Sequence, residues 1–274
     1  MPSSIDVDPS AGFECRLDGR VQLYARGSTA LIRMNRPDKR NALDGEQIAA
    51  LLQAFRLYIA ADELRAAVLT GAGGSFCSGG DIVMFQTLGP DNSLAFLQQG
   101  HEVLRQLETG AKPVIAAVNG YCLAGGLEVA LACDFIVAGN SARFAMAEVD
   151  LGLIPGWGGT VRLARALPAR VARQLLLTCE RIGPERAQAL GLVNEVLPDE
   201  EVVGRALALA DQIARQPATA VHAARAVVDA SVGGGSIDAA LKLEAAWSAH
   251  LFCSSAVRER VQAWVARAAG KAAS

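Results

Sequence analysis

Two glutamates lie in unusually apolar surroundings. Glu128 belongs to the run GGLEVALACDFIVAG, and Glu148 belongs to RFAMAEVDLGLIPG. Carboxylates in such company are rarely buried without a partner or a chemical task. Two buried carboxylates are suited to general acid and general base catalysis, with pKa values set by burial and by each other. The structural alternative is that each glutamate caps a helix or pairs with an arginine.

Two glycine-rich turns offer backbone donors for the same chemistry. The first turn starts at Gly71, after the apolar run AAVLT, and ends in GGD at 79–81, whereas the second ends in AGG at 124–126. Each turn is expected to precede a helix, where N–H groups are free and carry partial positive charge. Two such donors aimed at one point would form an oxyanion hole, whereas the alternative is a pair of ordinary tight turns.

A nucleotide-phosphate loop is disfavoured at the first of these turns. The sequence reads GAGGSF from Gly71, so Phe76 stands where the third glycine of the G-x-G-x-x-G fingerprint belongs. The chain also lacks the G-x-x-x-x-G-K-[ST] pattern of a P-loop. We therefore expect the exposed N–H groups to bind something other than a phosphate.

The composition is that of a globular chain with no nucleic-acid or membrane signature. The 274 residues are 51% hydrophobic with a formal net charge of −2, which gives no basic stripe for nucleic acid. No apolar run approaches the roughly 20 residues of a membrane helix, and MPSSIDVDPSAG lacks the features of a signal peptide. Six cysteines without a C-x-x-C pair predict reduced thiols in a cytoplasmic protein. Three scattered histidines argue against a metal site or a Ser/His/Asp arrangement.

The elements that must position these residues follow from hydrophobic periodicity. Alternation over 13–35 predicts a hairpin, and Asp44 with Gln47 predicts a capping box in front of an amphipathic helix over 45–60. Short apolar runs between glycine turns predict three strands, at 66–70, 114–118 and 135–138. Helices are expected over 83–110, after a loop at 89–92, and over 127–133.

These alternating elements indicate an α/β layered fold. The stretches 185–230 and 236–270 are alanine-rich and are predicted to be helical, with a break at 233–235. We therefore expect a flexible N-terminal tail over 1–12, a core with the active site over 13–200, and a C-terminal helical region over 201–274.

Four blocks of the chain resemble the enoyl-CoA hydratase/isomerase family, also called the crotonase family. They are NRPDKRNAL (35–43), VLTGAGGSFCSGGDI (68–82), KPVIAAVNGYCLAGGLEVALACDFIVA (112–138) and FAMAEVDLGLIPGWGGTVRL (144–163). The resemblance extends over about residues 20–268. It implies a spiral of ββα repeats followed by a helical trimerisation region, in a homotrimer or a dimer of trimers.

The resemblance also assigns roles to residues. It places the oxyanion hole on the N–H groups of Gly80 and Gly125, which would cradle a thioester carbonyl oxygen. It implies that coenzyme A lies along two segments, which consist of Lys39, Arg40, Asn41 and Ala42 and of Ser78, Gly79, Asp81 and Ile82. Trp157 would border the acyl pocket. Without the resemblance, Lys39 and Arg40 are a solvated basic turn, and Trp157 is a packing residue.

The two glutamates favour a hydratase, because many isomerases of this family keep only one acid. In the implied mechanism Glu128 activates a water that adds at C3 of an enoyl thioester, and Glu148 delivers a proton to C2. No metal or redox cofactor is implied, because coenzyme A is part of the substrate, and the pathway would belong to fatty acid or lipid metabolism. The alternatives are isomerisation, thioester hydrolysis, decarboxylation, carbon–carbon cleavage and a non-catalytic binding protein on the same fold.

Several positions depart from the common pattern of the family. Ala147 stands where the family often has proline, and Ala124 replaces a glycine. Trp264 stands where a phenylalanine is frequent, in the tail that would contact coenzyme A on a neighbouring subunit. The segment 83–98 contains three residues that fit either acyl contacts or a helix core, namely Met84, Phe85 and Leu88.

Overall fold

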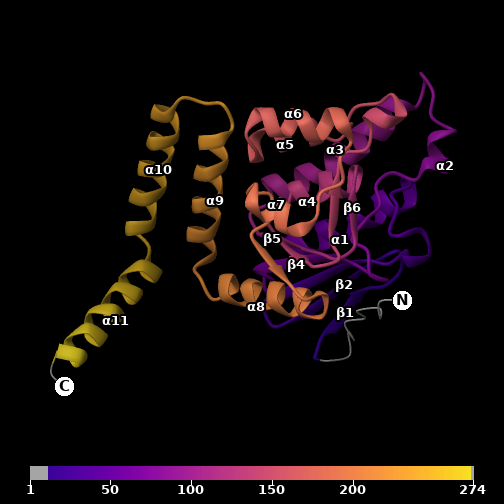
Figure 1. Ribbon diagram of the computed structural model, residues 1–274. Coiled ribbons are helices and arrows are strands. Elements are labelled where there is room, and N and C mark those ends of the chain that lie inside the picture. Colours follow the sequence, from indigo (N-terminus) through magenta and orange to yellow (C-terminus); the bar gives the residue numbers. More distant parts are fainter. Residues whose placement is uncertain (1–11, 273–274) are drawn as a thin grey trace. The chain divides into compact units, whose positions relative to one another are not determined.

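The computed structural model describes residues 12–272, and a seven-stranded sheet forms the centre of the unit that ends at Ala214 (Figure 1). In spatial order the strands are β1 (Glu14–Leu17), β2 (Val21–Arg26), β3 (Thr29–Met34), β4 (Ala66–Gly71), β5 (Val114–Val118), β7 (Phe135–Gly139) and β9 (Glu195–Leu197). The first three strands pair antiparallel, and all later neighbours are parallel. The expected hairpin and the three expected strands are confirmed.

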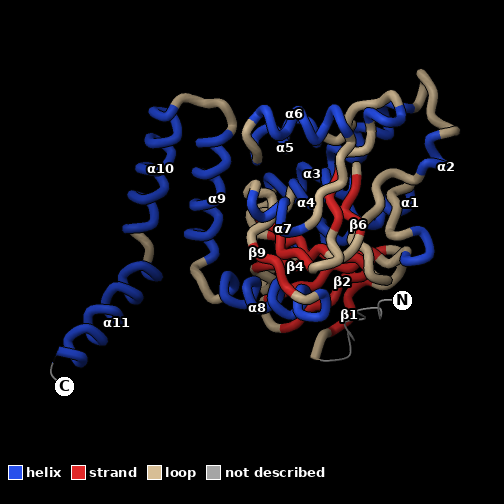
Figure 2. The backbone as a smooth tube through the Cα atoms, viewed as in Figure 1, coloured by secondary structure: helices blue, strands red, loops and turns tan. Residues whose placement is uncertain are grey.

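Helices cover both faces of this sheet, whose strands are red in Figure 2. The helix α8 (Val202–Ala214) packs on one face, and α1 (Gly45–Ala60) and α3 (Ser93–Thr109) belong to the cluster on the other. Because successive strand residues point to opposite faces, Val68 and Leu69 of β4 join different apolar clusters. Burial on both faces explains why the parallel strands read as continuous apolar runs.

A second, two-stranded sheet brings the two glutamates together. Its strands are β6 (Tyr121–Leu123) and β8 (Arg143–Ala145), which pair in parallel. Parallel strands end at the same edge, so β6 leads into α4 (Gly125–Leu131) beside the point where β8 leads to Glu148. The glycine turn expected at 124–126 is preceded by β6, which the sequence does not predict, because this three-residue strand depends on pairing with a distant segment.

The remaining elements of the core are short. They are α2 (Ile82–Phe85), α5 (Gly159–Ala166), α6 (Ala169–Thr178), α7 (Pro184–Ala189) and three 3-10 turns at Pro37–Lys39, Val149–Leu151 and Asp199–Glu201. Asp44 caps α1 as predicted, since its side chain accepts from the N–H of Gln47 at 2.8 Å. The second half of the predicted capping box is wrong, because within residues 12–272 the Gln47 side-chain oxygen accepts no hydrogen bond, while its amide nitrogen donates to the carbonyl of Arg20.

The chain divides into two compact units after Ala214. The helix α8 is therefore part of the first unit, because it packs on the sheet, although it lies beyond residue 200. The helical prediction for 185–230 is wrong at β9, which pairs in parallel with β7 between Gly191 and Pro198. The expected flexible tail at 1–12 lies almost wholly outside the described residues.

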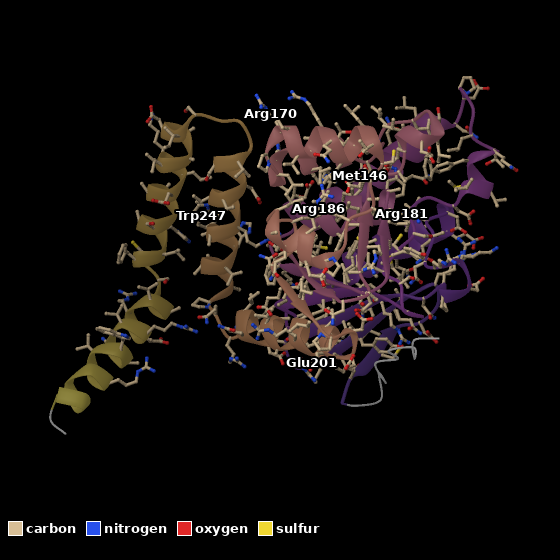
Figure 3. All side chains as sticks on the ribbon, viewed as in Figure 1. Met146, Arg170, Arg181, Arg186, Glu201 and Trp247 are labelled. Atoms are coloured by element: carbon tan, nitrogen blue, oxygen red, sulfur yellow. The ribbon has the colours of Figure 1, made fainter. Side chains whose placement is uncertain are left out.

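The second unit consists of α9 (Ala218–Val232), α10 (Ile237–Phe252) and α11 (Ser255–Ala272). Trp247, labelled on α10 in Figure 3, makes edge-to-face ring contacts with His222 and His250 at 5.5 and 6.0 Å between centroids. No helix among residues 12–272 has both the length and the apolar character to cross a bilayer.

Candidate active site

The two glycine turns lie side by side. Leu43 donates to the carbonyl of Gly79 at 2.8 Å and accepts from the N–H of Asp81 at 2.9 Å, which forms a parallel bridge with Gly80. In such a bridge the N–H of Gly80 itself points away from Leu43. A Cβ built on Gly125 would lie 3.6 Å from the Gly80 nitrogen. Within the described part of the chain, neither glycine N–H has a hydrogen-bond acceptor, and both glycines line one cavity.

The close approach of the turns requires their small residues. Gly79 has a φ of +102°, and a Cβ built on it would lie 2.9 Å from the Cβ of Ala124. A Cβ on Gly126 would overlap the carbonyl oxygen of Cys77. Ala124 itself has a φ of +48°, which L-residues rarely adopt, and its N–H donates to the carbonyl of Ala145 at 2.8 Å. Packing and pairing thus fix the direction of the Gly125 N–H.

Glu128 is buried and anchored by backbone donors. Its side chain is on α4, and the residue is only 3% exposed. Oε1 accepts from the N–H of Trp157 at 2.8 Å and of Gly159 at 2.7 Å. Burial raises the pKa of Glu128, while these two N–H groups and the charge of Arg162 act in the opposite direction. The carboxylate is therefore fixed through one oxygen.

Glu148 lies at the same cavity but has less support. It directly precedes the 3-10 turn Val149–Leu151, and within residues 12–272 its Oε2 is buried with no hydrogen-bond partner. Burial raises the pKa of Glu148 to about 7, and the nearby charge of Glu128 adds to the shift, whereas backbone hydrogen bonding opposes it. Near neutral pH, Glu148 therefore exchanges between its acid and carboxylate forms.

Arg162 braces the turn that holds Glu128. Its Nη1 donates to the carbonyl of Trp157, and its Nε and Nη2 form a two-pronged ion pair with Glu108 on α3. The turn passes through Gly158, where φ is +95°, and a Cβ there would overlap the guanidinium. Arg162 therefore holds the turn whose two N–H groups donate to Glu128. Sequence analysis missed this residue, because its partners lie far away in the chain.

The cavity has a volume of about 690 Å³. Both glutamates and both glycine donors line it, together with mostly apolar side chains. The other lining residues are Ser78, Ile82, Phe85, Leu88, Gly89, Ser93, Phe96, Leu97, Ala124, Ala147, Leu151, Leu153, Ile154, Pro155, Gly156 and Trp157. Of the three ambiguous residues in the segment 83–98, Phe85 and Leu88 line the cavity, and Met84 does not. Met146, labelled in Figure 3, is buried and directly precedes the lining residues Ala147 and Glu148 in the chain.

The structure brings some of the predicted coenzyme A residues to the cavity. Ser78, Ile82 and Trp157 line it, whereas Gly79, Asp81 and Ala42 do not. Lys39 and Arg40 are exposed on a turn that lies beside Ser78, whose N–H donates to the carbonyl of Arg40 at 3.0 Å. These two basic side chains therefore border the segment that leads into the cavity.

Asn41 and Asp81 serve the loops rather than the cavity. The Asn41 side chain is 0% exposed, accepts from the N–H of Arg36 and donates to the carbonyls of Ala72 and Ser75. Asp81 caps α2 and forms an ion pair with Arg36 at 2.9 Å. Burial would raise the pKa of Asp81, but hydrogen bonds from Arg36 and from backbone N–H groups outweigh it and lower the pKa.

The arrangement suits the chemistry of a carbonyl compound. Two backbone donors polarise a carbonyl oxygen, and two carboxylates with raised pKa values stand in the same cavity. Among residues 12–272, no group of three or more histidine, cysteine, aspartate or glutamate side chains is arranged to hold a metal ion. The structure thus brings both glutamates and both glycine turns, which the sequence analysis singled out, to one cavity.

Comparison with known proteins places this geometry in a family. The sequence profile of the Enoyl-CoA hydratase/isomerase family matches residues 25–271. The short-chain-enoyl-CoA hydratase of Clostridium acetobutylicum is 34% identical over 89% of this chain and 94% of its own. The crotonyl-CoA hydratase of Syntrophomonas wolfei is 36% identical over 79% of this chain and 83% of its own.

Solved structures give the same result. The enoyl-CoA hydratase from Bacillus anthracis superimposes with a TM-score of 0.87 at 29% identity, over 91% of this chain and 97% of its own. An enoyl-CoA hydratase from Geobacillus kaustophilus gives a TM-score of 0.86 at 32% identity, over 91% and 96% of the two chains. The expected crotonase-like α/β fold is confirmed. The chain belongs to the enoyl-CoA hydratase/isomerase family.

Proposed function

We propose that this chain is an enoyl-CoA hydratase, which adds water reversibly across the C2=C3 double bond of a 2-enoyl-CoA to give a 3-hydroxyacyl-CoA. The observation that carries the proposal is the presence of Glu128 and Glu148 in the cavity that also contains the N–H groups of Gly80 and Gly125. The relatives named as hydratases support the same class of enzyme, a hydro-lyase.

In this mechanism the thioester oxygen accepts from the N–H groups of Gly80 and Gly125. This draws electron density from C3 and stabilises the enolate that forms when C3 is attacked. Donors of this type are worth about 2.7–4 kcal/mol each in acyl chemistry. The cavity is lined mostly by apolar side chains, so few other groups are available to stabilise the developing charge.

The two glutamates divide the proton transfers. Glu128 takes a proton from the water whose oxygen attacks C3, and Glu148 gives its proton to C2. The net addition is one hydroxyl group and one hydrogen, and a proton passing from Glu128 to Glu148 resets the site. The anchored carboxylate of Glu128 suits the base, and the pKa of about 7 for Glu148 suits the donor.

Coenzyme A would enter past the exposed turn of Lys39 and Arg40, which lies beside Ser78. Lys39 and Arg40 would pair with its phosphates, because basic side chains bind phosphate oxygens through charge-assisted hydrogen bonds. The backbone of 39–42 and 78–82 would line the entrance. In this proposal the protein uses no resident cofactor, since the thioester itself supplies the activated double bond.

Hydration of crotonyl-CoA tests the proposal directly. The loss of conjugated-thioester absorbance is followed for the wild type, Glu128→Gln and Glu148→Gln, and the product is identified by mass. Each substitution is expected to reduce kcat by about 10²–10⁴-fold. Glu185→Gln, at an exposed position on α7, is the matched control and should keep full activity. Isomerised product without added water, or a Glu148→Gln variant with full activity, would contradict the proposal.

We also propose that the chain forms a homotrimer or a dimer of trimers. The support is the exposed apolar side chains on the helices of the second unit, among them Leu241, Phe252 and Trp264. Light scattering coupled to gel filtration would give the mass, and a monomer at micromolar concentration would contradict this assembly.

A further inference from the structure

The charge of the cavity restricts what the acyl group can carry. Glu128 and Glu148 are the only ionisable side chains that line it within residues 12–272, and the only hydroxyl groups come from Ser78 and Ser93. No lysine, arginine or histidine of the described chain lines it. An acyl group with its own carboxylate would lie unpaired beside two acids, which is unfavourable in a poorly hydrated space.

Three aromatic rings form a continuous wall from the reaction centre. This aromatic wall consists of Phe85, Phe96 and Trp157, with ring centroids 6.0 Å apart for the first pair and 5.4 Å for the second. A Cβ built on Gly80 would overlap the Phe85 ring, and one built on Gly125 would lie 3.5 Å from the Trp157 ring. The wall therefore begins beside both carbonyl-binding glycines, where the carbons next to the thioester must lie.

A glycine inside α3 fixes the wall in place. Trp157 is only 5% exposed, and a Cβ on Gly100 would overlap its indole ring. Glycine within a helix lowers stability by about 0.5–1 kcal/mol relative to alanine, so Gly100 makes α3 less stable than alanine would. The indole is therefore buried directly against the backbone of α3.

We propose that the group on C3 of the substrate is uncharged, apolar and larger than the methyl group of crotonyl-CoA, and that it lies against the aromatic wall. Phe96 and Trp157 are then specificity-determining residues. This inference rests on the proposed hydratase function, because it uses the same carbonyl position. It adds the substrate class, which the catalytic groups do not define.

The expected selectivity follows from the apolar area that such a group buries. Each methylene moved from water into an apolar site is worth about fourfold in kcat/KM. The four additional methylenes of 2-octenoyl-CoA should therefore raise kcat/KM at least tenfold over crotonyl-CoA, even where the mouth of the cavity leaves part of the chain in water. Replacing the terminal methyl group by a carboxylate should lower kcat/KM by about 100-fold, because no cation compensates it.

The experiment compares three substrates and four proteins. The substrates are crotonyl-CoA, 2-octenoyl-CoA and the ω-carboxylate analogue of the octenoyl thioester. The proteins are the wild type, Phe96→Leu and Phe96→Ala, with Leu94→Ala as the matched control, since Leu94 is 65% exposed on the same helix. Both Phe96 substitutions should lower the octenoyl-to-crotonyl ratio of kcat/KM, with Phe96→Ala lowering it at least fivefold, and the control should leave it unchanged.

Binding of the unreactive butyryl-CoA and octanoyl-CoA, measured by calorimetry, separates the two proposals. If no enoyl thioester is hydrated but octanoyl-CoA binds at least tenfold more tightly than butyryl-CoA, the hydratase function fails and the inference about the pocket stands. If all three thioesters are hydrated with equal kcat/KM, the hydratase function stands and the inference is overturned. Preference for crotonyl-CoA would also overturn it.

Discussion

Replacing Arg162 by methionine tests whether the brace behind Glu128 contributes to catalysis. The guanidinium is largely buried, and it donates to the carbonyl of Trp157 and to both carboxylate oxygens of Glu108. Methionine keeps much of the apolar stem but removes every donor and the charge. The turn that presents the N–H groups of Trp157 and Gly159 to Glu128 then loses its outer support.

The size of the effect follows from the hydrogen bonds to Glu128. A hydrogen bond to a charged group contributes about 1.5–3 kcal/mol. If the loosened turn weakens one of the two bonds by half, about 1 kcal/mol of positioning is lost, or roughly fivefold in kcat. If one bond is lost completely, the reduction in kcat reaches roughly 100-fold. KM should change little, because Arg162 does not line the cavity.

The pH profile distinguishes this role from a purely structural one. The positive charge of Arg162 opposes the rise in the pKa of Glu128 that burial causes. Without that charge the pKa rises further, so the acidic limb of kcat/KM should move to higher pH in Arg162→Met. Arg162→Lys keeps a charge but not the two-pronged geometry, so it should recover the pH profile more fully than kcat.

The controls separate local loosening from unfolding. Arg105→Met removes an exposed ion pair with Glu102 on α3 and should leave both kcat and the pH profile unchanged. Thermal unfolding followed by circular dichroism shows whether each variant is folded at the assay temperature. A folded Arg162→Met enzyme with the kcat and acidic limb of the wild type would refute the reasoning.

Further predictions concern pH and stability. Because burial raises the pKa of Glu148 to about 7, its protonated form stabilises the fold at low pH, and that contribution is lost as pH rises through 7. Glu148→Gln should therefore raise the thermal midpoint relative to the wild type at pH 8 but not at pH 4, and an equal change at both values would contradict the assignment. Asn41→Ala should cost about 2–4 kcal/mol in urea unfolding, since it leaves two buried carbonyls without their donor, and a loss below 1 kcal/mol would count against this role. Ala124→Gly should raise the free energy of unfolding by about 1 kcal/mol, because glycine adopts the positive φ of this position without strain. A thermal midpoint that does not increase in calorimetry would contradict this strain. Gly126→Ala should lower the midpoint strongly, because the new methyl group meets the carbonyl of Cys77, and an unchanged midpoint would show that the turns are free to separate.

The sequence reveals the reacting groups more readily than their supports. Glu128 and Glu148 are conspicuous because a carboxylate among apolar residues is unusual, and the glycine turns are conspicuous because they follow strands. Arg162 has no such signature, since an arginine on a short helix is ordinary until its partner on α3 is known. Phe96 is equally inconspicuous, because the spacing of α3 does not separate a core aromatic residue from a pocket aromatic residue.

Elements that depend on tertiary pairing were the least accessible to prediction. The strands β6 and β9 are three residues long, and each forms only beside a strand far along the chain. Asn41 shows the same limitation at the level of one side chain. Its place in a coenzyme A segment followed from the family resemblance, yet its amide is used completely by the backbone of its own loop and of the glycine turn after β4. The local pattern locates the loop but does not show which way its side chains face.

The unequal support of the two glutamates is the strongest structural argument for their different roles. Glu128 has two backbone donors on one oxygen and a nearby positive charge, all of which favour its ionised form despite burial. Glu148 has a buried oxygen without a partner in the described chain, and its pKa is raised to about 7. A base must be ionised before the reaction and a donor must be protonated, so the supported carboxylate suits the first task and the unsupported one suits the second. The two side chains are chemically identical, so their different roles follow from their surroundings alone.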